Sequence, residues 1–153
     1  MTKINLINTN ARSLRPKKES LLDCFNETDA DFAVLTETWL RDEHVQELAQ
    51  DLTLGSGLGI VTKNRPPCNN GVAYGGVGVV WRQAVGNFKE FVFRNPERFE
   101  ILATAGSIRG HKRKFVIIGC YIPPGYTKQR GACLLYTSPS PRDRQKSRMP
   151  SSA

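Results

Sequence analysis

Two polar side chains, Asn10 and Glu37, follow short stretches of strand-forming residues and are of types that bind a divalent cation. Asn10 comes just after a strand predicted over residues 3–8, and Glu37 comes just after one predicted over residues 31–36. If these strands are neighbours, both side chains lie at one edge of the sheet, where α/β proteins place their sites. A carboxylate beside an amide suits Mg²⁺, which also takes waters and phosphate oxygens. On its own, a glutamate at a strand end is more often solvated or salt-bridged.

The elements that must position these residues follow from the spacing of apolar side chains. Alternation over residues 3–8 predicts the first strand. A helix is predicted over residues 16–27, because Pro16 suits a first turn and one apolar stripe follows. Residues 31–36 form a short apolar run, typical of a strand covered on both faces. Asp42 is predicted to cap a second helix whose apolar face repeats at helical spacing. That face comprises Val45, Leu48, Ala49 and Leu52.

Beyond the second helix the pattern changes to strands. They are predicted over residues 58–62, 77–81, 88–93, 99–105 and 114–121. Two prolines and several glycines indicate a long loop over residues 63–76, and Pro123-Pro124-Gly125 ends the last strand. The order of elements, strand–helix–strand–helix followed by strands, predicts an α/β (α+β) fold.

Four motifs in this order resemble the endonuclease/exonuclease/phosphatase superfamily, and most closely the endonuclease domain of non-LTR retrotransposons. They are NARSL at 10–14, TETWL at 36–40, GGVGV at 75–79 and GCYIPP at 119–124. The first two together are fairly specific, whereas the glycine and proline motifs are individually common. The resemblance implies a four-layer α/β/β/α sandwich and a Mg²⁺-dependent enzyme, with Mn²⁺ as an alternative ion, that nicks DNA.

The resemblance also implies roles for individual residues. Glu37 would be the direct metal ligand, and Asn10 would help to hold a metal-bound water or a phosphate oxygen. Tyr121 would donate its hydroxyl group toward the phosphate; without the family, a packed aromatic residue is equally expected there. Arg12 would contact backbone phosphate, although a solvated loop arginine is as good an interpretation. His44 and His111 do not match the family's catalytic histidine.

Several of the family's motifs are not found before Ala132. These are its Gly-Asp-x-Asn segment, a later aspartate and a terminal Asp-His pair. General acid–base assistance of this kind is worth ~10²–10⁴ in rate, so negligible activity is expected of the chain as it stands. We also expect exposed apolar faces and poor solubility or a molten state, because the sandwich would be partial. A cooperative thermal unfolding transition of a monomer would contradict this expectation.

Residues 133–153 form a segment rich in Ser, Pro and Arg, with no helical or strand periodicity. Back-translation of residues 133–143 and 147–153 in one frame closely resembles a transposon-based sequencing-library adapter. We therefore interpret 1–132 as the N-terminal part of the domain and 133–153 as a disordered, non-native tail. The alternative is a natural low-complexity tail.

Composition limits the classes of function. The net charge of +8 suits a polyanionic partner such as nucleic acid, although the tail holds four of the 22 basic residues and one of the 14 acidic ones. No apolar run approaches the roughly 18 residues of a membrane span, and an intracellular protein is expected, nuclear if it comes from a retrotransposon. Four cysteines without a CxxC pair argue against zinc and disulfides.

Three interpretations of function remain open at this point. The first is a DNA endonuclease, with a reverse-transcriptase domain downstream in the intact parent. The second keeps the superfamily but changes the substrate to a phosphorylated lipid, sugar or nucleotide. The third is a non-catalytic basic module that binds nucleic acid.

Overall fold

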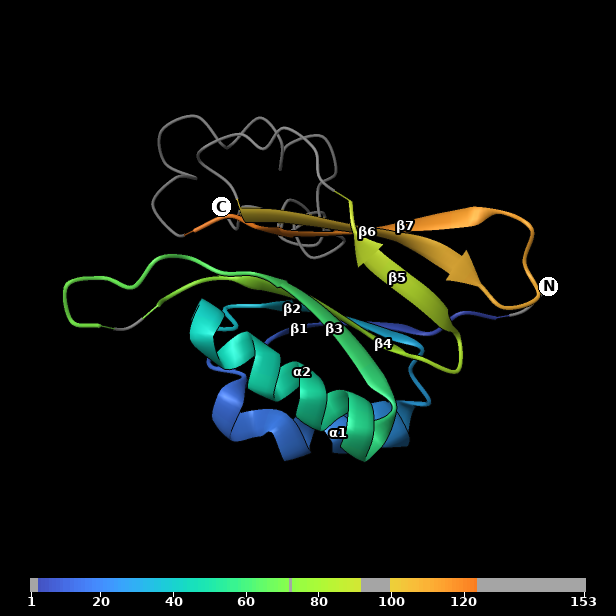
Figure 1. Ribbon diagram of the computed structural model, residues 1–153, viewed down its shortest axis with the longest axis horizontal. Helices are drawn as coiled ribbons and strands as arrows, with labels where there is room; N and C mark the ends of the chain where they lie inside the picture. Colours follow the sequence, from blue (N-terminus) through green and yellow to red (C-terminus); the bar gives the residue numbers. More distant parts are fainter. Residues whose placement is uncertain (1–2, 72, 92–99, 124–153) are drawn as a thin grey trace, which may run out of the picture. The chain divides into compact units, whose positions relative to one another are not determined.

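A computed structural model describes residues 3–71, 73–91 and 100–123 of the chain. The chain divides into two units, 1–121 and 122–153, and the first unit holds every assigned helix and strand. Figure 1 shows two sheets, with both α-helices on one side of the four-stranded sheet. In chain order the elements are β1 (Leu6–Asn10), η1 (Arg15–Lys17), α1 (Lys18–Thr28), β2 (Phe32–Thr36), α2 (Asp42–Ser56), β3 (Leu58–Lys63), β4 (Val77–Arg82), β5 (Gly86–Glu90), β6 (Glu100–Ile108) and β7 (Lys114–Tyr121).

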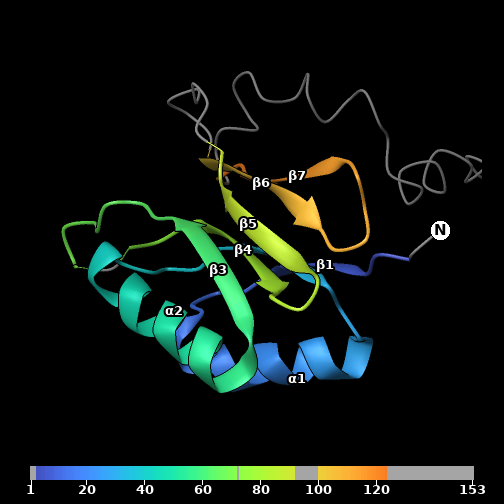
Figure 2. The same ribbon diagram turned by 45° about the vertical axis from the view of Figure 1, so that its right-hand side comes forward.

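The first sheet has the strand order β1-β2-β4-β3, and the second has the order β5-β6-β7. β1 and β2 run parallel, which the crossover through α1 allows, and the other pairs are antiparallel. The turned view in Figure 2 shows the second sheet lying over the face of the first that the helices leave free. The predicted α/β (α+β) class is therefore confirmed, with one helical layer and two sheets in the described residues.

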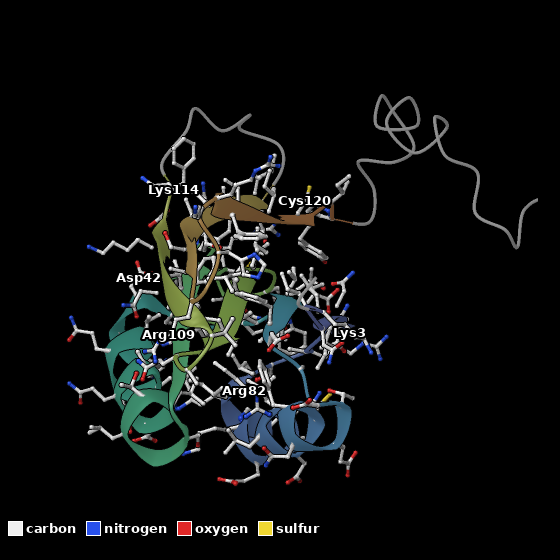
Figure 3. All side chains as sticks on the ribbon, turned by 90° about the vertical axis from the view of Figure 1, so that its right-hand side faces the viewer. Lys3, Asp42, Arg82, Arg109, Lys114 and Cys120 are labelled. Atoms are coloured by element: carbon white, nitrogen blue, oxygen red, sulfur yellow. The ribbon has the colours of Figure 1, made fainter. Side chains whose placement is uncertain are left out.

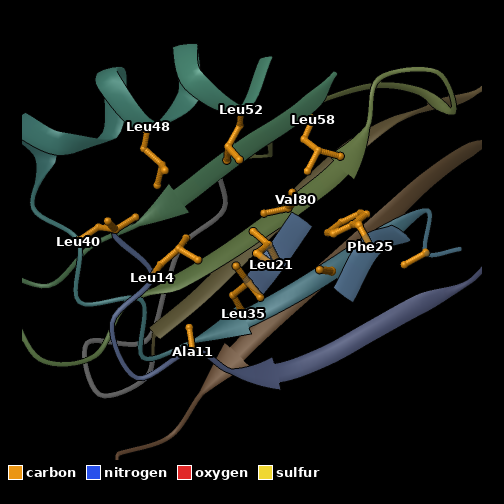
Figure 4. Close-up of a cluster of buried hydrophobic side chains, with 12 residues drawn as sticks. Ala11, Leu14, Leu21, Phe25, Leu35, Leu40, Leu48, Leu52, Leu58 and Val80 are labelled. Atoms are coloured by element: carbon orange, nitrogen blue, oxygen red, sulfur yellow. The ribbon is translucent and has the colours of Figure 1, made fainter. Parts of the chain in front are cut away.

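A core of apolar side chains joins the helices to the first sheet (Figure 4). The helices contribute Leu21, Phe25, Leu48 and Leu52, which lie on the stripes that the sequence predicts. Each such side chain contributes ~1.5–3 kcal/mol when it is fully buried. Because Leu35 of β2 belongs to this core, the strand that ends at the candidate site is anchored one residue before its last position.

The space between the two sheets is filled by a second set of apolar side chains. Phe32 and Phe88 meet edge to face with ring centroids 5.0 Å apart, and Trp81 packs beside them. Near the other end, a Cβ atom on Gly119 would lie 2.7 Å from Val77 and 3.0 Å from Val34, so the sheets approach closely there. On the outer face of the second sheet, Val116 and Ile118 are 56% and 62% exposed.

Several observed boundaries differ from the predicted ones; β6, for example, continues to residue 108. β1 runs two residues further than predicted, through Asn10, because parallel pairing with β2 continues to the Asn10–Thr36 pair. Asp42 begins α2 and does not cap it, and Arg41 occupies the N-cap position. β5 begins earlier than predicted, at Gly86; residues 92–93, predicted to end it, lie outside the described residues.

Within the described residues, no helix has the length and apolar character needed to cross a membrane. Cys24, Cys68 and Cys120 are free thiols. Cys133 and the remaining residues of the predicted tail lie outside the described residues.

Candidate functional site

The carboxyl ends of β1 and β2 bring the first two candidate residues to one edge of the sheet. Asn10 is paired with Thr36, the residue immediately before Glu37. Because side chains alternate along a strand, Asn10 and Thr36 project to the same face as Val34, which packs between the two sheets. The two residues on which the metal hypothesis depends are therefore neighbours at a single edge.

The loop that carries Glu37 has an unusual backbone held by its neighbours. Glu37 and Trp39 have φ values of 53° and 51°, in the left-handed region that non-glycine residues seldom adopt. On one side, the Ser13 N–H donates to the Glu37 carbonyl group over 3.0 Å; on the other, the Trp39 N–H donates to the Gly75 carbonyl group over 2.9 Å. Such strain persists where the surroundings over-determine it, and it clusters at functional sites.

Tyr121, at the end of β7, reaches Glu37 from the second sheet. Its hydroxyl group donates a hydrogen bond to Oε1 of Glu37 over 2.9 Å. Burial raises the pKa of Tyr121 from its ordinary 10.0 to about 12, and the hydrogen bond to Glu37 is the second cause. The phenol is therefore a neutral hydrogen-bond donor at physiological pH, aimed at the carboxylate.

The raised pKa of Tyr121 predicts a loss of stability in alkali. Because the folded-state pKa of about 12 exceeds the ordinary 10.0, the stabilisation is complete below about pH 10 and is lost as the pH rises toward 12. In an ultraviolet titration of tyrosinate, Tyr121→Phe should remove the component that ionises near pH 12. Tyr74→Phe, at a 40% exposed position, is the control and should leave that component. Persistence of the component in Tyr121→Phe would contradict the assignment.

Asn10 and Arg12 are linked to each other in the loop after β1. Oδ1 of Asn10 accepts the Arg12 N–H over 3.1 Å, while Nζ of Lys17 donates to the carbonyl groups of Ala11 and Arg12 over 2.7 and 3.0 Å. Arg12 itself is exposed at this edge and has a φ of 43°. The amide of Asn10 is thus held in place, and the guanidinium of Arg12 remains accessible to solvent.

The oxygen atoms at this edge match Mg²⁺ in type but are few. Within residues 3–71, 73–91 and 100–123, no group of three or more His, Cys, Asp or Glu side chains could hold a metal ion. Mg²⁺ commonly keeps several waters and binds through one or two carboxylates together with substrate phosphates. The half-buried carboxylate of Glu37 and the amide oxygen of Asn10 therefore fit a weakly held, largely hydrated ion.

Glu100 is a part of this edge that the sequence does not single out. It is paired with Tyr121 across β6 and β7, and its side chain is only 13% exposed. Oε2 accepts the Gly76 N–H over 2.5 Å, and Oε1 forms an ion pair with Arg65. The predicted strands 99–105 and 114–121 place Glu100 near Tyr121 in an antiparallel pair, but the sequence does not fix the register that makes the two residues partners.

The two histidines lie in the predicted elements. His44 is on α2 beside Arg15 and Glu43, and His111 is in the β6–β7 turn with its ring edge-to-face against Phe115. Neither is joined to Glu37 or Tyr121 by any contact in the described residues.

Comparisons with known proteins agree with this fold. A model of the Endonuclease/Exonuclease/phosphatase family matches residues 4–149, a range that overlaps the predicted tail. An AP endonuclease from Leishmania major is 18% identical with a TM-score of 0.51, over 78% of this chain and 40% of that one. A 3′ phosphatase from Neisseria, bound to a product DNA hairpin, is 20% identical with a TM-score of 0.56, over 88% and 51%.

A family protein from Leptotrichia buccalis is 12% identical, with a TM-score of 0.54 over 91% of this chain and 64% of that one. A search of curated proteins gave no significant match. The alignments cover between 40% and 64% of the length of these solved structures. At these identities the likeness concerns the fold.

Proposed function

The chain belongs to the endonuclease/exonuclease/phosphatase family, and on this premise we propose that it forms part of the active site of a Mg²⁺-dependent phosphodiesterase. The observation that carries the proposal is the hydrogen bond between Glu37 and Tyr121 at the carboxyl ends of β1 and β2. A half-buried carboxylate and a neutral phenol meet there, and the amide of Asn10 lies at the end of the neighbouring strand, where α/β sheets place their sites.

Each of these side chains has a distinct role in the proposal. Glu37 would hold the ion directly, and Asn10 would help to hold a metal-bound water or a phosphate oxygen. Tyr121 donates one hydrogen bond, to Glu37 in the absence of substrate and to a phosphate oxygen when a substrate displaces that contact. The bound ion would supply Lewis-acid polarisation of the phosphoryl group and lower the pKa of a bound water.

We propose DNA as the substrate and nicking as the reaction, as in the endonuclease domain of a non-LTR retrotransposon. The residues TETWL at 36–40 support this choice. The β6–β7 turn, at the opposite end of β7 from Tyr121, adds basic side chains for phosphate contacts away from the reacting edge. Arg109 and Lys114 flank that turn (Figure 3), and with Lys89 they line a depression of about 400 Å³ that contains no acidic residue among those described. A downstream reverse-transcriptase domain belongs to the same proposal.

The basic turn predicts a change in the salt dependence of DNA binding. Affinity falls as the salt concentration rises, and each phosphate contact that is lost makes the slope of log affinity against log salt concentration less steep by about 0.9. Lys114→Gln should therefore reduce the slope by about that amount in fluorescence anisotropy with a labelled duplex. The matched control is Lys18→Gln on α1, where the cation is already paired with Asp51 at 2.9 Å. Equal slopes for the two variants would contradict a contact at the turn.

Nicking of supercoiled plasmid tests the proposed activity. The genomic reading frame that continues past codon 132, in place of residues 133–153, should encode a protein that nicks plasmid in the presence of Mg²⁺. Nicking should stop when EDTA is added. The same reading frame should encode Gly-Asp-x-Asn and Ser-Asp-His downstream. DNA binding without nicking would instead favour the non-catalytic module.

A further inference from the structure

The two residues joined by the central hydrogen bond come from different sheets. Glu37 follows β2 of the first sheet, and Tyr121 ends β7 of the second. The sheets meet through apolar side chains, among them Val34, Val77 and Leu102. Because apolar contact is non-directional, it does not by itself fix the geometry of a polar contact between the sheets. A directional contact is needed to hold a hydrogen bond that spans the two sheets.

Glu100 supplies such a contact directly beside Tyr121. It belongs to β6 of the second sheet, and its carboxylate accepts the Gly76 N–H over 2.5 Å at the entry to β4 of the first sheet. The ion pair with Arg65 holds the other carboxylate oxygen to the loop between β3 and β4. With 13% of its side chain exposed, this carboxylate is shielded from competing water.

From Gly76 the contact continues through backbone hydrogen bonds to the loop of Glu37. The Gly75 carbonyl group accepts the Trp39 N–H over 2.9 Å, and the Gly76 carbonyl group accepts the Thr38 N–H over 3.4 Å. A Cβ atom on Gly75 would lie 2.8 Å from Oε1 of Glu100, so the carboxylate is packed tightly against this turn. The turn is therefore fixed from the second sheet on one side and fixes residues 37–39 on the other.

We propose that Glu100 is a positioning residue that sets the separation of Glu37 and Tyr121 by tying the Gly75–Gly76 turn to the second sheet. Its effect on the cation rests on the proposed function, whereas its effect on the loop does not. Replacement of residues that support a metal ligand typically costs 10–100-fold in affinity.

Hydrogen exchange of single amides, measured by NMR on the protein that carries the complete domain, tests the positioning role. In Glu100→Ala the Trp39 amide should lose at least about 10-fold of its protection, because the turn that holds it loses its anchor. The Arg82 amide, bonded to the Asp31 carbonyl group at the other end of β4, is the internal reference and should not change. Glu90→Ala, at an exposed glutamate of β5, is the matched control and should leave both amides unchanged.

A second measurement connects the loop to the cation. Mn²⁺ affinity, followed by electron paramagnetic resonance, should fall about 10-fold or more in Glu100→Ala and remain unchanged in Glu90→Ala. Glu100→Gln keeps an acceptor for Gly76 but loses the charge that attracts Arg65. It should show a smaller loss in both measurements, and it carries the test if Glu100→Ala does not fold.

Unchanged protection of the Trp39 amide in both Glu100 variants would overturn the positioning role. An equal loss of protection at the Arg82 amide would also overturn it, because it would mean general destabilisation. If Trp39 responds as expected but the wild-type chain binds no Mn²⁺, the positioning role stands and the proposed metal function fails.

Discussion

Glu37→Ala is expected to lower the rate of Mg²⁺-dependent plasmid nicking at least about 100-fold in the protein that carries the complete active site. Fixed electrostatic contributions to a transition state are typically worth ~10²–10³ in rate, and Glu37 is the carboxylate proposed to hold the ion. The fold should survive, because the Ser13 N–H that holds this loop bonds the carbonyl group of residue 37, and the substitution removes the single side-chain hydrogen bond from Tyr121.

Glu90→Ala is the control for this experiment. It removes the same charge from an exposed position on β5, away from the edge where β1 and β2 end, and should retain the wild-type rate. Circular dichroism should be the same for both variants. Nicking by Glu37→Ala at the wild-type rate would remove Glu37 from the metal role.

Gly76→Ala is expected to lower the free energy of unfolding by about 2–5 kcal/mol. Gly76 has a φ of 89°, and a Cβ atom there would lie 2.4 Å from Oγ1 of Thr38, which is fully buried. A non-glycine residue at positive φ costs ~1–2 kcal/mol, and forcing extra atoms into a packed region costs ~1–3 kcal/mol. Urea denaturation of the protein that carries the complete domain measures the change.

Gly110→Ala separates these two contributions. Gly110 has a φ of 80°, but nothing lies within 4 Å of a Cβ atom at that position. The control should therefore lose only the ~1–2 kcal/mol that belongs to the backbone conformation. Equal losses for the two variants would show that the close approach to Thr38 is unimportant.

The sequence predicted the parts of the fold that depend on apolar periodicity. The stripes of both helices and the buried run of β2 appear in the structure because burying apolar area dominates their placement. The predicted element boundaries were wrong where contacts with distant parts of the chain, and not the local sequence, determined the structure. β1 extends to Asn10 because β2 pairs with its last residues, although their polar side chains are typical of a turn.

The candidate site was predicted unevenly for a related reason. Asn10 and Glu37 could be placed together because each follows a strand, and parallel neighbours end at the same edge. The bond between Tyr121 and Glu37 joins residues 84 positions apart in different sheets, a contact that neither strand's own periodicity specifies. Glu100 escaped notice because an acidic residue at the start of a strand has no distinctive local pattern.

Binding of Mn²⁺ to the chain tests most directly whether Glu37 belongs to a cation site. Titration followed by electron paramagnetic resonance should show one weak site per chain in the wild type. Glu37→Gln keeps the size of the side chain and an acceptor for Tyr121 but removes the charge, and should weaken binding at least about 10-fold. Equal Mn²⁺ affinity of the wild type and Glu37→Gln, or no binding by either, would contradict the account.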